Sequence, residues 1–137
     1  MPLKAPKILI IDDDPDFIEA VTPILKSALY DVASVLSPAE VKEKIFGEKP
    51  DLIILDIMMD SLFDGFSICH AVKTAPEYQA FHNVPILMIS AVKEITGTGF
   101  PIKKDDPGMA GPDEYMDKPV KPAELLAKIE GMLKLVS

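Results

Sequence analysis

The sequence predicts an α/β domain whose parallel β-sheet is covered by helices on both faces, a doubly wound arrangement. Two observations support this prediction. Short apolar, β-branched runs alternate with segments that carry apolar residues at helical spacing. Several of the runs are apolar at successive positions, as expected for strands that are buried on both faces of a parallel sheet.

The first strand and the first helix lie near the N-terminus. Residues Lys7–Ile11 (KILII) form a short apolar run and predict a buried strand. Asp14 and Pro15 then provide a helix start, with Asp as the cap and Pro in the first turn. Apolar residues recur at helical spacing from there to Leu29, and Pro23 within this pattern is expected to kink the helix because it removes a backbone donor.

The next segment predicts a strand, a helix and a second buried strand. Asp31–Val35 is a weaker strand than the first. Ser37–Glu40 has the pattern of a capping box, which opens a helix that extends to about Phe46 and stops at Gly47. Asp51–Asp56 (DLIILD) gives the clearest buried strand, and it ends in a carboxylate.

The second half predicts a helix from Gly65 to about Thr74, a strand at Val84–Ser90, a strand at Asp113–Asp117 and a last helix from Pro122. Residues 97–112 contain four of the seven glycines and three of the thirteen prolines. A helix that started at Ala91 should therefore end by about residue 97, because glycine and proline disfavour helix.

Charge and composition restrict the partners and the compartment. The net charge is −8, and all 14 basic residues are lysines, so no guanidinium is available to read phosphates or guanines. We therefore expect no direct contact with nucleic acid, and none with an anionic membrane. The lone Cys69, the lack of an apolar run long enough for a membrane span and the absence of a secretory signal favour the cytoplasm.

Polar residues gather where the predicted strands end. Asp12, Asp13 and Asp14 follow the first strand, Asp56 ends the third, Ser90 ends the fourth and Lys118 follows the fifth. The carboxyl ends of parallel strands meet at one edge of the sheet, where ligands bind. Two carboxylates about 4 Å apart repel by roughly 4 kcal/mol at an effective dielectric of 20. A hard cation such as Mg²⁺ would relieve this repulsion and bind phosphate oxygens, while a carboxylate can also act as a phosphoryl acceptor.

These motifs together resemble the receiver domains of bacterial two-component response regulators. The resemblance extends from Lys7 to about Leu135, and it implies one receiver domain over residues 1–137 with its core at about 7–135. It also implies a flavodoxin-like sheet of five parallel strands in the order 2-1-3-4-5. A sensor histidine kinase or a phosphotransfer protein would donate the phosphoryl group, and a downstream target would read it. Separate substrate turnover is not expected, whereas a weak or phosphorylation-dependent dimer is compatible with the family.

The resemblance also implies a role for each matching residue. Asp56 matches the phosphoacceptor, Asp13 the direct Mg²⁺ ligand, and Asp12 the acid that reaches the ion through water. The backbone carbonyl of Met58 completes that metal site. Ser90 matches the hydroxyl that bonds the phosphoryl group when the switch closes, and Lys118 matches the lysine that pairs with the phosphate. Tyr115 matches the aromatic residue that swings inward when the hydroxyl moves.

Two features depart from the family pattern. Asp60 stands where a proline is usual, and the Asp64-Gly65 pair arrives one residue late, so the loop after Asp56 should be more acidic and differently shaped. The chain between Ser90 and Lys118 is longer than usual. We therefore expect a shortened or remodelled fourth helix.

Two alternatives remain at this stage. A haloacid-dehalogenase-like phosphatase would use Asp12 and Asp14 as its Asp-x-Asp pair, with Ser90 as its second motif and residues 103–106 as its later motifs. That alternative leaves Asp56 without a role. A degenerate receiver that binds its partner without any phosphoryl group shares the fold, but it does not require the intact set of acids, hydroxyl and lysine.

Overall fold

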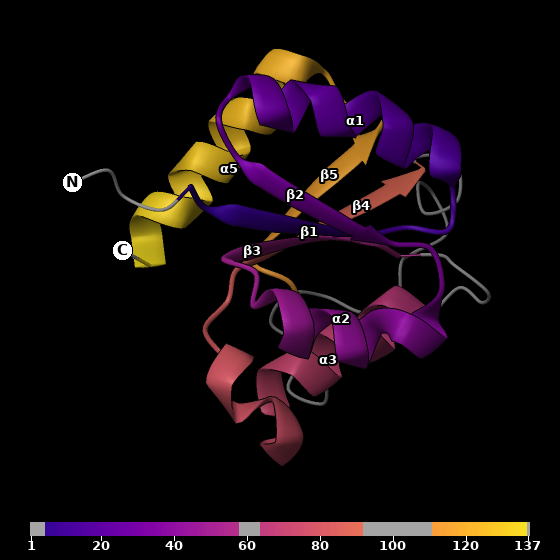
Figure 1. The fold of residues 1–137 in the computed structure, drawn as a ribbon, viewed down its shortest axis with the longest axis vertical. Coiled ribbons are helices and arrows are strands. Elements are labelled where there is room, and N and C mark those ends of the chain that lie inside the picture. Colours follow the sequence, from indigo (N-terminus) through magenta and orange to yellow (C-terminus); the bar gives the residue numbers. More distant parts are fainter. Residues whose placement is uncertain (1–4, 58–63, 92–110, 137) are drawn as a thin grey trace.

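The computed structural model describes residues 5–57, 64–91 and 111–136, and predictions that fall on the other residues lie outside it. Five parallel strands form one sheet in the order β2-β1-β3-β4-β5 (Figure 1), which confirms the predicted fold and strand order. The strands are β1 (Lys7–Ile11), β2 (Asp31–Val35), β3 (Leu52–Asp56), β4 (Ile86–Ala91) and β5 (Glu114–Lys118). The described helices are α1 (Pro15–Ser27), α2 (Val41–Glu48), α3 (Asp64–Thr74) and α5 (Pro122–Val136), with short 3₁₀ helices at η1 (Pro38–Glu40) and η2 (Pro76–Phe81).

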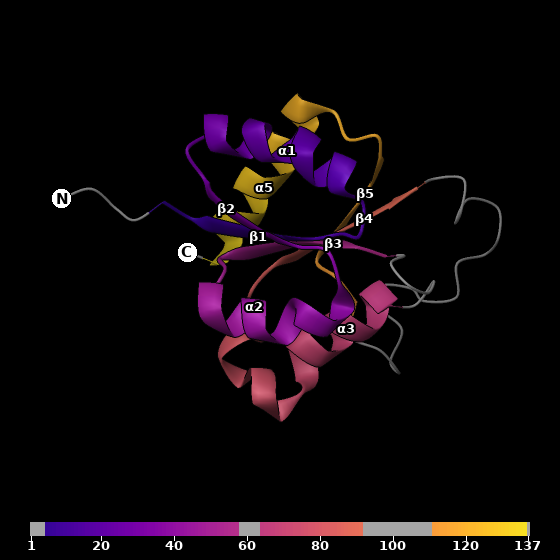
Figure 2. The same cartoon turned by 45° about the vertical axis from the view of Figure 1, so that its right-hand side comes forward.

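The helices cover the two faces of the sheet in separate layers. Helices α1 and α5 lie on one face, and α2 and α3 lie on the other (Figure 2). Successive strand residues point to opposite faces. Accordingly, Ile8 and Ile10 pack in the cluster that holds the buried residues of α1 and α5, whereas Leu9 and Ile11 pack with those of α2 and α3.

The registers of the strands align their carboxyl ends. Ile11 pairs with Val35 on one side and with Leu55 on the other, and Ala91 pairs with Lys118. The residues that follow β1 therefore lie beside the last residues of β3, and these lie beside the last residues of β4. This edge of the sheet is where the sequence places its polar residues.

The start of α1 follows the sequence prediction. The Asp14 side chain accepts a hydrogen bond from the Asp16 N–H at 2.9 Å, which satisfies one of the free donors of the first turn. Asp14 itself donates its backbone N–H to Asp12 Oδ1 at 2.9 Å. Helix α1 continues through Pro23 as far as Ser27. Asp14 thus acts as a cap and also fixes the orientation of the neighbouring Asp12 carboxylate.

The region around α2 differs from the prediction. Ser37 caps the 3₁₀ turn η1, and α2 itself begins only at Val41. The predicted stop at Gly47 is wrong, because α2 includes Gly47 and ends at Glu48. Lys49 takes the left-handed conformation instead, with φ 51°, and its N–H bonds to the Ile45 carbonyl at 2.9 Å.

Two other boundaries also differ from the prediction. Ala91 is the last residue of β4, where it pairs with Lys118, and therefore does not start a helix. Lys118 belongs to β5 rather than following it. The short helix η2 was not predicted, and the expected remodelling of a fourth helix lies outside the described residues. Among the described residues, no helix has the length and apolar character needed to cross a bilayer.

The C-terminus of α1 contains a left-handed leucine. The N–H of Leu29 bonds to the Lys26 carbonyl at 2.9 Å, and the N–H of Tyr30 bonds to the Leu25 carbonyl at 3.1 Å. This pair of bonds is a Schellman motif, whose left-handed position usually holds glycine. Leu29 has φ 71°, and 80% of the residue is exposed. Its side chain therefore contributes little packing to offset the conformational cost.

Replacing Leu29 with glycine should raise the free energy of unfolding by about 0.5–1 kcal/mol, because glycine adopts the left-handed region without a Cβ penalty. Denaturant unfolding of both proteins measures the change. Leu36→Gly is a matched control, since Leu36 is also exposed but does not have positive φ. Equal effects of the two substitutions would contradict the argument.

Candidate functional site

The buried polar side chains of the described residues lie at the carboxyl edge of the sheet. They are Asp12, Asp56 and Ser90, which are 1%, 5% and 4% exposed. Asp12 directly follows β1, Asp56 ends β3, and Ser90 is the penultimate residue of β4. Burial of a polar group costs free energy unless the group is hydrogen-bonded or paired with a charge, so buried polar groups often mark a functional site. All three residues were singled out from the sequence, and the structure brings them together.

Three carboxylates at this edge could hold a metal ion. One oxygen from each of Asp12, Asp13 and Asp56 lies within 4.8 Å of the others, and Asp13 is exposed, so the group opens to solvent. Asp12 Oδ2 is buried, and its partner within the described part of the chain is the Lys118 ammonium, an ion pair at 3.1 Å. Such a donor set fits a hard divalent cation that retains several waters. The carbonyl of Met58, the fourth predicted ligand, lies outside the described residues.

Lys118 places a positive charge beside the carboxylates. Its Nζ lies 3.1 Å from Asp12 Oδ2 and 4.0 Å from Asp56 Oδ1. The Lys118-Pro119 peptide bond is cis. The Phe17 ring, from the first turn of α1, lies under the same ammonium, with its centroid 4.6 Å from Nζ. Phe17 is one of the apolar residues that recur at helical spacing in this part of the sequence, and nothing in the sequence indicated that it approaches the site.

The environment of Asp12 disfavours its charged form. Burial raises the pKa of Asp12 above its ordinary 3.8, and the nearby Asp13 charge adds to this effect. The Asp14 backbone N–H and the Lys118 ammonium act in the opposite direction without cancelling it. The folded protein therefore binds the Asp12 proton more tightly than the unfolded chain does. Ionised Asp12 reduces stability as the pH rises above the unfolded pKa, and it has no such effect below it.

We expect Asp12→Asn to raise the melting temperature by about 3 °C near neutral pH in the presence of a chelator, because asparagine has no charge to desolvate. The gain should shrink toward zero as the pH falls below about 4, where aspartate is also neutral. Melting curves across this pH range test the sign. Asp16→Asn, an exposed neighbour, is the control. A gain that persisted unchanged at low pH would contradict this prediction.

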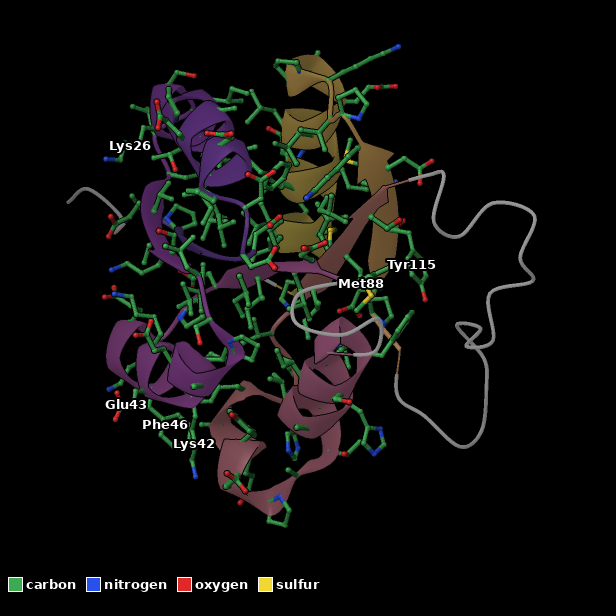
Figure 3. All side chains as sticks on the ribbon, turned by 90° about the vertical axis from the view of Figure 1, so that its right-hand side faces the viewer. Lys26, Lys42, Glu43, Phe46, Met88 and Tyr115 are labelled. Atoms are coloured by element: carbon green, nitrogen blue, oxygen red, sulfur yellow. The ribbon has the colours of Figure 1, made fainter. Side chains whose placement is uncertain are left out.

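Tyr115 lies away from the carboxylates. It is half-buried on β5, where it pairs with Met88 of β4, and it packs against the cluster on the α2/α3 face (Figure 3). Its hydroxyl is buried and has no hydrogen-bond partner within the described residues, Ser90 included. Burial raises the pKa of Tyr115 above its ordinary 10.0. The structure therefore places Tyr115 on β5 with its hydroxyl unpartnered within the described residues, and its role in a switch stays a prediction.

Gly65 holds the backbone close to the end of β3. Its N–H donates to the Ile57 carbonyl at 2.9 Å. A Cβ built on Gly65 would lie 2.6 Å from Ile57 Cα and 2.8 Å from Ile57 O, and closer still to the Asp56 carbonyl oxygen. The sequence identified Gly65 only as a helix start. The structure shows that this position requires glycine because the chain returns directly against the backbone of Asp56.

Comparison with known proteins agrees with this architecture. The sequence matches the family model of the response regulator receiver domain over residues 8–130. It is 33% identical over 129 residues to the DNA-binding dual master transcriptional regulator RpaA of Synechocystis, covering 94% of this chain and 49% of RpaA. It is 32% identical over 128 residues to the alkaline phosphatase synthesis regulatory protein PhoP of Bacillus subtilis, covering 93% and 48%. The chain thus spans about half the length of these curated relatives.

Solved structures give the same result. A CheY-like receiver domain protein from Methanospirillum hungatei superimposes with a TM-score of 0.75 at 25% identity, covering 95% of this chain and 94% of that one. The receiver domain of a histidine kinase from Syntrophus aciditrophicus has the same TM-score and identity, covering 97% and 93%. These matches favour the receiver over the dehalogenase-like alternative. The protein belongs to the response regulator receiver domain family of two-component signal transduction.

Proposed function

We propose that this chain is a single receiver unit that accepts a phosphoryl group on Asp56. The observation that supports this most directly is that the buried polar side chains of the described residues converge at one sheet edge beside Lys118. A sensor histidine kinase or a phosphotransfer protein is the proposed donor. The phosphorylated form would then bind a downstream target or pass the group onward.

The chemistry follows from the positions of the charges. A carboxylate oxygen of Asp56 attacks phosphorus, the bond from phosphorus to the donor breaks, and the donor leaves with that electron pair and takes up a proton from solvent. Lys118, already 4.0 Å from Asp56 Oδ1, neutralises an oxygen of the transferred group. Asp13, Asp56 and the Met58 carbonyl are the proposed direct ligands of Mg²⁺, and Asp12 is proposed to reach the ion through water. When bound there, the ion would withdraw negative charge from the phosphoryl oxygens.

Ser90 and Tyr115 are the proposed switch. Ser90 is the penultimate residue of β4, and its neighbour Ile89 pairs with Asp56, which supports a bond from its hydroxyl to a phosphoryl oxygen on Asp56. The buried Tyr115 hydroxyl lacks a partner among the described residues, a condition that costs about 1–3 kcal/mol. Movement of Ser90 toward the phosphoryl group would allow Tyr115 to turn inward and find one.

The output of this unit is proposed to be protein binding, including a weak or phosphorylation-dependent dimer. Its relative RpaA is named as DNA-binding, but the chain covers only 49% of that protein. The net charge of −8 and the absence of arginine argue against DNA contact by this chain itself. We propose that it works in the cytoplasm and catalyses only its own phosphorylation and dephosphorylation.

Mass spectrometry after treatment with acetyl phosphate and Mg²⁺ tests the proposal. We expect one phosphoryl group per wild-type chain and none on Asp56→Asn, because Asp56 is the acid that ends the central strand β3. Asp12 is also buried beside Lys118, but burial disfavours its charged form, which is the nucleophile. Asp16→Asn removes an exposed acid near the site and should behave as wild type. Equal modification of wild type and Asp56→Asn would refute Asp56 as the acceptor.

A further inference from the structure

The Lys118 ammonium lies between two kinds of partner. The Asp12 and Asp56 carboxylates lie on one side, at 3.1 Å and 4.0 Å, and the face of the Phe17 ring lies 4.6 Å from Nζ. Phe17 comes from the first turn of α1 and Lys118 from the end of β5. A cation within about 6 Å of a ring centroid is attracted by the quadrupole of the ring.

The carboxylates and the aromatic ring differ in whether ligand binding changes their interaction with the ammonium. Both carboxylates belong to the proposed metal and phosphoryl site, so their charges are redistributed when a ligand binds. The ring of Phe17 is neutral and does not belong to that site, so ligand binding there does not change its charge. Lysine has a flexible four-carbon stem, and Lys118 is 23% exposed, so carboxylates alone leave its head poorly fixed.

Packing fixes the ring itself. Phe17 contacts the cluster that α1 and α5 form against the sheet, which includes Val21 and Leu25 of its own helix. Asp14 caps the helix three residues before Phe17, so the first turn is ordered by a hydrogen bond. The ring of Phe17 is thus held by the core and also meets the Lys118 ammonium.

We propose that Phe17 is a positioning residue whose ring holds the Lys118 ammonium beside Asp56. This role rests on the proposed function, because it concerns the lysine that meets the phosphoryl group. Leucine at position 17 would keep an apolar side chain in the cluster but remove the quadrupole. Tyrosine would keep an aromatic face. The pair of substitutions therefore separates positioning from simple packing.

The contact is tested first without any phosphoryl chemistry. Ring currents should shift the NMR signals of the Lys118 ε-methylene upfield in the wild type and in Phe17→Tyr, and the shift should disappear in Phe17→Leu. Phe46→Leu, a substitution of another partly exposed phenylalanine in α2, is the control and should leave the signal unchanged. A Lys118 signal that is the same in wild type and Phe17→Leu would overturn the proposal.

The role is tested next by titration with beryllofluoride, a phosphoryl mimic, in the presence of Mg²⁺. Affinity should fall roughly five-fold in Phe17→Leu and return to near wild type in Phe17→Tyr. In a background of Lys118→Met the Phe17→Leu substitution should have no further effect, because the cation is gone. Equal losses with and without Lys118 would overturn the proposal.

The two readouts also separate this inference from the proposed function. A wild type that shows the upfield Lys118 signal but neither binds beryllofluoride nor is phosphorylated would refute the proposed function, and with it the role of the contact. A wild type that is phosphorylated on Asp56, with an affinity for beryllofluoride that Phe17→Leu leaves intact, would refute the role of Phe17 alone.

Discussion

Replacing Gly65 with alanine is expected to lower the melting temperature by about 10 °C, which corresponds to roughly 3 kcal/mol in a domain of this length. The added Cβ would overlap backbone atoms of Asp56 and Ile57, including Ile57 Cα at 2.6 Å. No side chain can rotate away to relieve that overlap, so the loop or the end of β3 must shift. Because the shifted backbone carries Asp56, phosphorylation should fall together with stability.

The chain contains its own controls for this experiment. Gly47 lies inside α2 and Gly131 inside α5, and nothing lies within 4 Å of a Cβ built on either. Alanine at these positions should raise stability by about 0.5–1 kcal/mol, since glycine is a poor helix former. Thermal melts of the three variants should therefore give one large loss and two small gains. A Gly65→Ala protein that melted like the other two would refute the close approach.

Lys118→Met should slow phosphorylation of Asp56 by roughly 100-fold, the usual effect of removing a preorganised group that stabilises charge in a transition state. Methionine retains much of the apolar stem but carries no charge to place beside Asp56. The measurement is the rate of phosphoprotein formation with acetyl phosphate and Mg²⁺. Lys121→Met, an exposed lysine three residues later, should have no effect. If both variants reacted at the wild-type rate, Lys118 would not be the group that neutralises the phosphoryl oxygens.

The sequence predicts those residues of the site whose positions are determined by the ends of the strands. An apolar run that stops at a polar residue marks the carboxyl end of a strand, and parallel pairing brings these ends together whatever the helices do. Asp12, Asp56 and Ser90 lie together for this reason. The assignments that depended on this rule agree with the structure apart from two one-residue shifts, which place Lys118 inside β5 and leave Ser90 next to last in β4.

The remaining features depend on contacts that are not local in sequence. Glycine often ends a helix, but α2 continues through Gly47 to Glu48 and ends because Lys49 adopts a left-handed conformation. The proximity of Phe17 to Lys118 joins residues a hundred positions apart, and helical spacing gives no sign of it. The need for glycine at position 65 follows from its close approach to the backbone of Asp56 and Ile57 and not from any propensity.

The separation of the core into two layers has a consequence for sequence divergence. Residues of the α1/α5 cluster and of the α2/α3 cluster alternate along β1 and β3, so they meet only through the backbone of the sheet. Substitutions without shared partners add nearly independently. The side chains of one layer can therefore be substituted and repacked without changes in the other layer, while the strand ends between the layers keep their positions. A library that randomises the core of one layer should yield folded proteins whose carboxylate edge is unchanged. The same independence of the two layers explains how relatives at 25–33% identity can share this fold.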